Sequence, residues 1–242
     1  MTRPVPIVGG AVLVLALSVG LAGCAGRVGV APEGGAGLPP GFVDVREVVP
    51  DASLDLRYLG PDNFVGEPID GYLAPRAILT REAAEALAAV QAELRPFGLG
   101  VKIFDAYRPQ RAVDHFVRWA AEVSDVRTKE AYYPDVDKAD LFAEGYIADR
   151  SSHSRGSTVD LTLVRLDGSE EGTALDMGTP FDFFGPASWP DDPRIPAPAR
   201  AHRLLLRALM TKHGFDPYAR EWWHFTLRDE PFPDMRFDFP VR

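Results

Sequence analysis

The sequence has almost no cysteine, since Cys24 is the only one among its 242 residues. One cysteine cannot form an intrachain disulfide, so an exported domain of this chain must rely on its apolar core alone. If Cys24 is modified, no thiolate remains, and a metal site must use histidine, aspartate or glutamate. Histidine is also scarce. Three of the five histidines lie on predicted helices and are interpreted as surface or cap residues: His115, His202 and His213.

Runs of positive charge are also absent. The 26 lysines and arginines are scattered and outnumbered by 35 aspartates and glutamates, which gives a formal net charge of −9. Nucleic-acid binding requires a basic face, so the composition excludes nucleic acid as a partner. Hydrophobic residues make up 46% of the chain, which is enough for a true core. A chain of this length corresponds to one domain, or to one domain with a tail.

A long apolar run occurs near the N-terminus, from Ile7 to Ala22, and Arg3 is the only charged residue before it. Its sixteen residues are near the upper limit for the core of a signal peptide and are short for a membrane-spanning helix. The run leads into LAGC, residues 21–24, which resembles the bacterial lipobox. In lipobox proteins, cleavage before the cysteine leaves that cysteine to carry the lipid. The alternatives are an ordinary secretory signal and an uncleaved anchor.

These features predict three parts of the chain. Residues 1–23 are expected to be a lipoprotein signal peptide. Residues 24–41 are expected to be the lipidated Cys24 and a flexible tether rich in glycine and proline. Residues 42–242 are expected to be the folded domain. The mature protein is therefore predicted to be exported and lipid-anchored to a bacterial membrane, on its periplasmic or extracellular face. The sequence gives no indication of the oligomeric state.

Strands and helices are predicted without a regular βαβ repeat. Alternating or β-prone residues predict strands at 53–59, 101–104, 157–164 and 221–227. Helices are expected from the N-cap Thr80 to the Pro96–Gly98 stop, behind Pro109, and over residues 199–214. This mixture predicts an α+β fold.

The other two histidines, His153 and His224, lie at the edges of predicted strands. Together with Asp160 they predict a three-ligand zinc site with a fourth position open to water. The small polar segment between His153 and Asp160 is expected to be flexible, which would let both side chains reach one ion. Strand alternation places Asp160 in a polar cleft with Thr158 and Thr162. The alternative is that Asp160 is a strand-edge charge and His153 a loop histidine, because the spacing alone is a weak pattern.

Two further residues carry candidate catalytic groups. Glu221 lies three residues before His224 and is either a fourth ligand or a general base. The base is favoured, because four protein ligands would close the metal to water. The pair requires a bend, because residues three apart in a flat strand point to opposite faces. Arg108 precedes Pro109 at the end of a predicted strand, where it would stabilise an oxyanion or pair structurally with Asp105.

Six segments occur in one order along the domain: DLRYLGPDNFVG, DGYLAPRAIL, DAYRPQRAV, SSHSRGSTVDLTL, MGTPFDFF and EWWHF. Together they resemble the zinc D-alanyl-D-alanine dipeptidases, the group that includes the vancomycin-resistance dipeptidase. The resemblance spans roughly Asp55 to Phe225. It implies the fold of the Hedgehog/D,D-peptidase superfamily, a single α+β domain with a central, mostly antiparallel sheet flanked by helices. The best-known members lack a signal sequence, so an exported lipoprotein departs from the pattern.

The resemblance implies a metal centre and two catalytic residues. One Zn²⁺ per chain would be held by His153, Asp160 and His224. Glu221 falls on the catalytic glutamate of the family, and Arg108 falls on its transition-state arginine. None of these positions is substituted in this sequence.

Two substrate contacts are also implied by the resemblance. Asp182 falls on the aspartate that holds the substrate ammonium, although a turn residue within FDFF is the alternative. Ser151 falls on a serine that lies close to bound substrate. The implied reaction is hydrolysis of the free dipeptide D-Ala-D-Ala to two D-alanines by a metal-activated water. A D,D-carboxypeptidase acting on peptidoglycan stem peptides is one alternative, and a non-catalytic, zinc-bearing binding module of the envelope is another.

Overall fold

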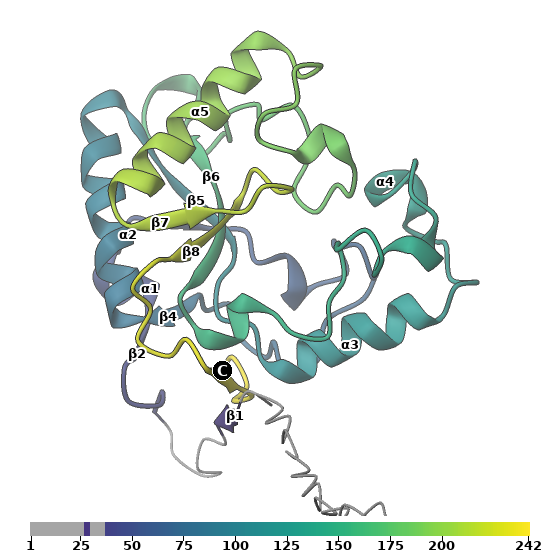
Figure 1. The fold of residues 1–242 in the computed structure, drawn as a ribbon. Helices are drawn as coiled ribbons and strands as arrows, with labels where there is room; N and C mark the ends of the chain where they lie inside the picture. The colour runs from purple at the N-terminus through teal and green to yellow at the C-terminus, as the bar shows by residue number, and fades with distance from the viewer. Residues whose placement is uncertain (1–26, 30–36) are drawn as a thin grey trace, which may run out of the picture.

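The computed structural model describes residues 27–29 and 37–242, which contain one α+β domain (Figure 1). The α+β class predicted from the sequence is therefore confirmed. The expected signal peptide and Cys24 lie outside the described residues. In the part of the chain that the structure describes, no helix combines the length and the apolar character that crossing a membrane requires.

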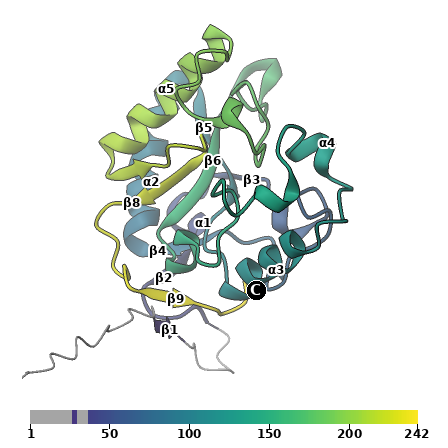
Figure 2. The same cartoon turned by 45° about the vertical axis from the view of Figure 1, so that its right-hand side comes forward.

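A five-stranded sheet with the order β3-β5-β6-β8-β7 lies at the centre of the domain. Its strands, in that order, are Ser53–Leu54, Leu99–Asp105, Thr158–Arg165, His224–Leu227 and Phe215–Pro217. β3 and β5 pair in parallel, and the other neighbouring strands pair antiparallel. The expected, mostly antiparallel central sheet is confirmed, and β6 is its middle strand (Figures 1 and 2).

Two small sheets flank the central one. β2 (Phe42–Asp44) pairs antiparallel with β4 (Ile78–Thr80). β1 (Arg27–Gly29) pairs in parallel with β9 (Met235–Phe237). β1 belongs to the segment that was expected to be a flexible tether, and its pairing with β9 connects those three residues to the folded domain.

Helices lie on both sides of the central sheet (Figures 1 and 2). α2 packs against β5, α5 packs against β7, and the two helices contact each other. α3 lies across the sheet from them, with the short α4 beside it (Figure 1). The α-helices are α1 (Val45–Val48), α2 (Arg81–Leu94), α3 (Gln110–Ala121), α4 (Lys129–Tyr132) and α5 (Ala197–Lys212). The 3-10 helices are η1 (Arg57–Leu59), η2 (Arg95–Phe97), η3 (Lys138–Asp140), η4 (Ser152–Arg155), η5 (Gly168–Glu170) and η6 (Pro186–Ser188).

Helix α2 begins and ends where the sequence predicts, but its N-cap residue makes a different hydrogen bond from the one expected. Thr80 occupies the N-cap position, but its hydroxyl makes no capping hydrogen bond. Thr80 Oγ1 instead lies 2.8 Å from Ser157 Oγ, so it joins the helix to the segment before β6. At the other end, the chain tightens into η2 and turns at Gly98 with φ 66°. Glycine is the residue that adopts this left-handed conformation most readily, which explains the stop.

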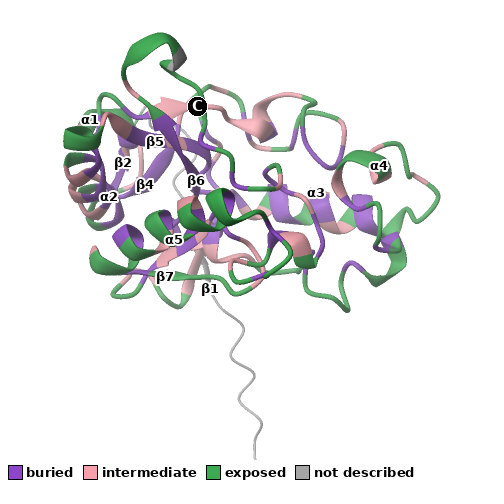
Figure 3. Cartoon of the chain, turned by 90° about the horizontal axis from the view of Figure 1, so that it is seen from above, coloured by how far each residue is buried: buried purple, intermediate pink, exposed green. Residues whose placement is uncertain are grey.

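Both faces of β6 are buried (Figure 3). Every residue from Thr158 to Val164 is buried, because α3 and its neighbouring loops cover the face opposite α2 and α5. The expectation that Thr158 and Thr162 share a polar cleft with Asp160 is wrong, because both are buried and neither lines the cavity that Asp160 lines. Asp160 is therefore a buried carboxylate in the middle strand of the sheet.

The predicted strand 53–59 is also shorter than expected. β3 ends at Leu54, and the chain then forms the 3-10 helix η1. This turn places Tyr58 in the core, where its side chain is almost fully buried. Leu54, Leu56 and Tyr58 therefore all pack in or against the core, but they do not belong to one continuous strand.

The segment between His153 and Asp160 forms a defined turn that packs against another part of the chain. His153 belongs to η4, which ends at Gly156 in the left-handed conformation with φ 85°. A Cβ atom at Gly156 would lie 2.2 Å from Cε1 of Phe42, in β2. The two side chains converge because a tight turn and a long-range contact hold the segment in place.

We predict that Gly156→Ala lowers the free energy of unfolding by about 2–5 kcal/mol. About 1–2 kcal/mol comes from the left-handed backbone and about 1–3 kcal/mol from overpacking against Phe42. Gly172→Ala is the matched control, because Gly172 has φ 79° and no atom within 4 Å of the added Cβ. It should lose only about 1–2 kcal/mol in urea denaturation. Equal losses in the two variants would show that the Phe42 contact does not constrain this turn.

Candidate active site and metal centre

A cavity of about 410 Å³ opens on the α3 side of the sheet. Its walls come from α3, η4, β6 and the segment that leads into β8. All seven candidate site residues within the described chain line this cavity: Arg108, Ser151, His153, Asp160, Asp182, Glu221 and His224. The structure thus brings together side chains that are up to 116 positions apart in the sequence, from Arg108 to His224.

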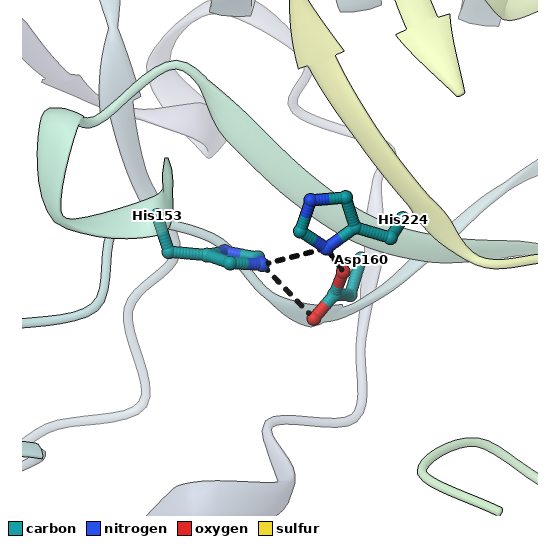
Figure 4. A group of neighbouring side chains, drawn as sticks. All are labelled: His153, Asp160 and His224. Carbon is teal, nitrogen blue, oxygen red and sulfur yellow. Dashed lines mark hydrogen bonds and ion pairs between the residues drawn. The ribbon is translucent and has the colours of Figure 1, made fainter. Parts of the chain in front are cut away.

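His153, Asp160 and His224 meet at one point of the cavity wall (Figure 4). His153 Nε2 lies 3.2 Å from Asp160 Oδ2, and His224 Nδ1 lies 3.2 Å from Asp160 Oδ1. The same two ring nitrogens lie 3.3 Å from each other. The three side chains therefore form a triangle of potential ligands, in which each ring nitrogen faces a different oxygen of Asp160.

The backbone sets this arrangement. Asp160 of β6 pairs directly with His224 of β8, so the two side chains are neighbours across the sheet. His153 approaches from η4, and its Nδ1 lies 2.7 Å from the carbonyl oxygen of Ala106. A neutral imidazole that donates from Nδ1 to this carbonyl keeps Nε2 free to bind a metal. The carbonyl thus selects the tautomer in which Nε2 faces the cavity.

The donor set fits a zinc ion. A tetrahedron with bonds of about 2.0–2.1 Å has edges of about 3.3 Å, which is close to the 3.2–3.3 Å between the two ring nitrogens and from each nitrogen to its nearer Asp160 oxygen. Asp160 Oδ1 is buried and makes no hydrogen bond, although His224 Nδ1 is close. A buried carboxylate oxygen without a hydrogen bond is costly unless a cation compensates it. Two imidazoles and one carboxylate leave a fourth position open, which is typical of catalytic zinc.

Burial and the neighbouring charges affect the acidity of these groups. Burial alone would raise the pKa of Asp160, but attraction to His153 and His224 overcomes it and holds that pKa far below its usual range. Burial lowers the pKa of His153, with Asp160 opposing the shift. Both effects favour an ionised Asp160 and a neutral His153, which are the protonation states that a metal binds. Burial would also lower the pKa of His224, but the contact with Asp160 and its charge raise it.

Glu221 lies in a turn immediately before β8. The turn brings its Oε2 to 3.5 Å from His224 Nδ1, which supplies the bend that the pair requires. The glutamate is thus next to the triangle without being one of its corners. Burial raises the pKa of Glu221 to about 7, with the charge of His224 opposing the shift. A carboxylate in this position can exchange protons near neutral pH.

The structure confirms the pairing of Arg108 with Asp105 and also places the arginine at the cavity wall. Its Nε and Nη2 each lie 2.9 Å from Asp105 Oδ2, so the structural pair is present. The guanidinium also lines the cavity, and its Nη2 is 3.6 Å from Asp160 Oδ2. Its Cζ lies 5.1 Å from the ring centroids of Tyr58 and Phe116. The aromatic contacts and the ion pair hold a cation at the cavity wall.

Asp182 is buried at the cavity wall and has a left-handed backbone with φ 60°. The Tyr58 hydroxyl donates to its Oδ2 at 2.9 Å. Burial raises the pKa of Asp182 well above its usual range, and repulsion from Asp160 adds to the shift. The carboxyl group has no ion pair among the described residues, so a cation that enters the cavity would lower this pKa and stabilise the carboxylate form. Asp182 also lies in a turn, and aspartate tolerates this left-handed conformation there, so the turn interpretation and the cavity position hold together.

Ser151 lines the cavity beside η4, where its Oγ accepts a hydrogen bond from His153 N–H at 3.2 Å. The remaining three histidines have other partners. His115 lies beside Glu67 and Asp70, His202 Nδ1 beside the Asp176 carbonyl, and His213 beside Glu93.

Sequence reasoning did not identify Tyr58 as a site residue. The only indication of a functional role was that Tyr58 lies in the first of the six segments. The strand predicted at 53–59 did not indicate that its side chain would face the site. Asp105 was considered only as a structural partner of Arg108. Both residues contact a candidate site residue through buried polar atoms.

Comparison with known proteins gives one consistent result. The peptidase M15 family, described as D-ala-D-ala dipeptidase, matches residues 39–242. A D-alanyl-D-alanine dipeptidase of Streptomyces coelicolor is 45% identical over 200 residues, which cover 83% of this chain and 98% of that protein. One from Enterococcus faecium is 43% identical over 202 residues, covering 84% and 98%. One from Escherichia coli K12 is 37% identical over 189 residues, covering 77% and 84%.

The His153, Asp160 and His224 triangle leads to a metal-binding prediction. The purified protein should retain about one Zn²⁺ per chain, and His153→Ala and His224→Ala should each weaken zinc binding more than about 100-fold. Even outer-sphere partners of a zinc ligand contribute about 10–100-fold, so loss of a ligand costs more. His202→Ala, which removes a ring outside the cavity, should leave the zinc affinity unchanged. Stoichiometric zinc in both ligand variants, measured by elemental analysis after dialysis, would contradict the assignment.

Proposed function

The chain belongs to the D-Ala-D-Ala dipeptidase family of peptidase M15, and we propose that it hydrolyses free D-Ala-D-Ala to two molecules of D-alanine. The observation that supports this best is the convergence of all seven candidate residues on one cavity. The enzyme is a zinc metallopeptidase, with its zinc held by His153, Asp160 and His224. When bound, Zn²⁺ supplies a Lewis acid that acidifies water and polarises the peptide carbonyl.

Glu221 moves the proton in this reaction. Its Oε2 lies 3.5 Å from Nδ1 of His224, a residue that would hold the zinc, so Glu221 would lie beside a water activated by that ion. Oε2 accepts a proton from the attacking water and returns it to the nitrogen of the leaving D-alanine. One carboxylate can do both because the water and the leaving nitrogen are bonded to the same carbon after attack.

Arg108 stabilises the oxygen of the former carbonyl. Attack on the peptide bond moves negative charge onto this oxygen, and a fixed guanidinium donates hydrogen bonds to it. The aromatic contacts and Asp105 hold the guanidinium before substrate arrives, so little reorganisation is needed during the reaction. Arg108 therefore contributes chiefly to the transition state rather than to substrate binding.

Asp182 selects a substrate with a free amino terminus. Tyr58 occupies one of its carboxylate oxygens and leaves the other for the substrate ammonium. A stem peptide has an amide nitrogen in place of the ammonium, and binding it would leave the buried carboxylate without a cation. Asp182 thus favours the dipeptide over longer peptides. Ser151 lines the same cavity and would lie close to the substrate.

We predict that Glu221→Gln lowers kcat about 10²–10⁴-fold, because the amide cannot accept the proton of the attacking water. The variant should keep its zinc and its fold. Glu93→Gln is the matched control, since Glu93 pairs with Lys212 and His213 away from the cavity, and its kcat should match the wild type. If zinc is lost from Glu221→Gln, the glutamate is a ligand and its assignment as a base is wrong.

We predict that the wild-type enzyme cleaves D-Ala-D-Ala and leaves N-acetyl-D-Ala-D-Ala intact. Asp182→Ala should narrow this difference, mainly by lowering kcat/KM for the free dipeptide about 10–100-fold. That loss corresponds to a charged hydrogen bond of about 1.5–3 kcal/mol. Comparable kcat/KM values for the two substrates in the wild-type enzyme would overturn the dipeptidase assignment and favour a carboxypeptidase acting on stem peptides.

We also propose that the enzyme is exported and lipid-anchored through Cys24. The apolar run from Ile7 to Ala22 and the LAGC segment support this, and the family match begins only at residue 39. The intervening residues give the domain a connection to the membrane surface. The anchor would place hydrolysis of D-Ala-D-Ala on the periplasmic or extracellular face of a bacterial membrane.

The anchor is tested by expressing the full chain in bacteria with an alkyne-labelled fatty acid. The wild type should be labelled and should fractionate with membranes, whereas Cys24→Ala should carry no label, because only the cysteine thiol and its new amino group accept lipid. Equal labelling of both proteins, or an unlabelled wild type in the soluble fraction, would refute the lipoprotein assignment.

A further inference from the structure

The oxyanion donor Arg108 is itself oriented by a buried pair of residues. We propose that Asp105, held by the hydroxyl of Tyr72, is a positioning residue for the Arg108 guanidinium, an inference that rests on the proposed function. Asp105 is buried at the end of β5, and its Oδ2 accepts from Arg108 Nε at 2.9 Å and lies 2.9 Å from Nη2. Its Oδ1 accepts from the Tyr72 hydroxyl at 2.7 Å.

The aromatic contacts of Arg108 cannot set its orientation alone. A cation above an aromatic ring is attracted to the face of the ring, and this attraction changes little when the guanidinium rotates within its own plane. The two nitrogens that face Asp105 Oδ2 remove this freedom. The remaining nitrogen, Nη1, is then directed away from Asp105 as the donor for substrate.

Asp105 also keeps the guanidinium away from the metal centre. Nη2 lies 2.9 Å from Asp105 Oδ2 and 3.6 Å from Oδ2 of the metal ligand Asp160. The two aspartates are register partners on β5 and β6, so both carboxylates reach the same cation. Without the charge of Asp105, the closest carboxylate for Arg108 is Asp160. The guanidinium would then turn towards the metal ligand and away from the substrate.

Tyr72 fixes the carboxylate of Asp105 from the opposite side. Its ring is buried, and the backbone around it pairs with the penultimate residue Val241. Leu73 N–H donates to Val241 O and Val241 N–H donates to Gly71 O, both at 2.8 Å. Pairing between two segments far apart in the sequence therefore fixes the backbone that carries the Tyr72 hydroxyl. His153 Nδ1 lies 3.6 Å from Asp105 Oδ2 but is closer to the Ala106 carbonyl, so the role of Asp105 concerns the arginine.

The first test compares two deletions of a buried tyrosine hydroxyl. Tyr72→Phe removes the donor to Asp105, and Tyr107→Phe removes a hydroxyl that donates to the Phe239 carbonyl at 3.0 Å. Both variants should shift the urea midpoint by similar amounts. Tyr72→Phe alone should lower kcat for D-Ala-D-Ala, by about 2- to 10-fold at unchanged KM, which is the range of one hydrogen bond. Equal kcat values in the two variants would overturn the proposal.

The second test asks whether Asp105 acts through Arg108. A phosphinate analogue of D-Ala-D-Ala, which carries an anionic tetrahedral centre, is titrated by calorimetry into four zinc-loaded proteins: wild type, Asp105→Asn, Arg108→Ala and the double variant. Asp105→Asn should weaken binding about 10-fold in the wild-type background and less than about 2-fold when Arg108 is absent. Equal losses in both backgrounds would show that Asp105 acts independently of the arginine.

These measurements separate the inference from the function on which it rests. Hydrolysis of D-Ala-D-Ala by the wild-type enzyme tests the function, and its absence would overturn both. If the wild type is active and the Tyr72 and Asp105 variants behave like the Tyr107 control, only the positioning role fails.

Discussion

The site depends on one constraint, the burial of the Asp160 carboxylate in the middle strand of the sheet. An uncompensated charge in such a place costs several kcal/mol, so cations and donors must surround it. His153, His224 and the Arg108 guanidinium all lie within 3.6 Å of its oxygens. Zinc completes this compensation, because one carboxylate oxygen otherwise has no hydrogen bond. A zinc ion at this site would thus also compensate the charge that Asp160 buries in the middle strand of the sheet.

The same burial organises the chemistry around the metal. Asp105, Asp160, Asp182 and Glu221 place four carboxyl groups near a single arginine, so the cavity is short of positive charge. Under the proposed function, zinc and the substrate ammonium would supply the missing positive charge. The role proposed for each carboxyl group follows from its contacts. Asp160 faces two imidazoles, Asp182 faces a tyrosine hydroxyl, and Glu221 lies beside His224. A dipeptide carries its cation in the place where the cavity lacks one.

Much of this site was predictable from the sequence, because the metal ligands and catalytic residues fall within short motifs. The α+β class followed from local periodicity, and all the implied residues within the described chain line one cavity. Three features were not predictable. The turn at Gly156 depends on Phe42, which is distant in the sequence. Tyr58 enters the site through a 3-10 turn where periodicity indicated a strand. The orientation proposed for Arg108 involves Tyr72, whose backbone pairs with the penultimate residue Val241.

The account rests on one zinc ion bound by His153, Asp160 and His224, and anomalous diffraction at the zinc edge tests this most directly. Crystals of the zinc-loaded enzyme should show one strong anomalous peak per chain. The peak should lie about 2.0–2.2 Å from His153 Nε2, His224 Nδ1 and a carboxylate oxygen of Asp160. A peak bonded to other residues, or a fully loaded enzyme whose zinc lies outside this cavity, would contradict the account.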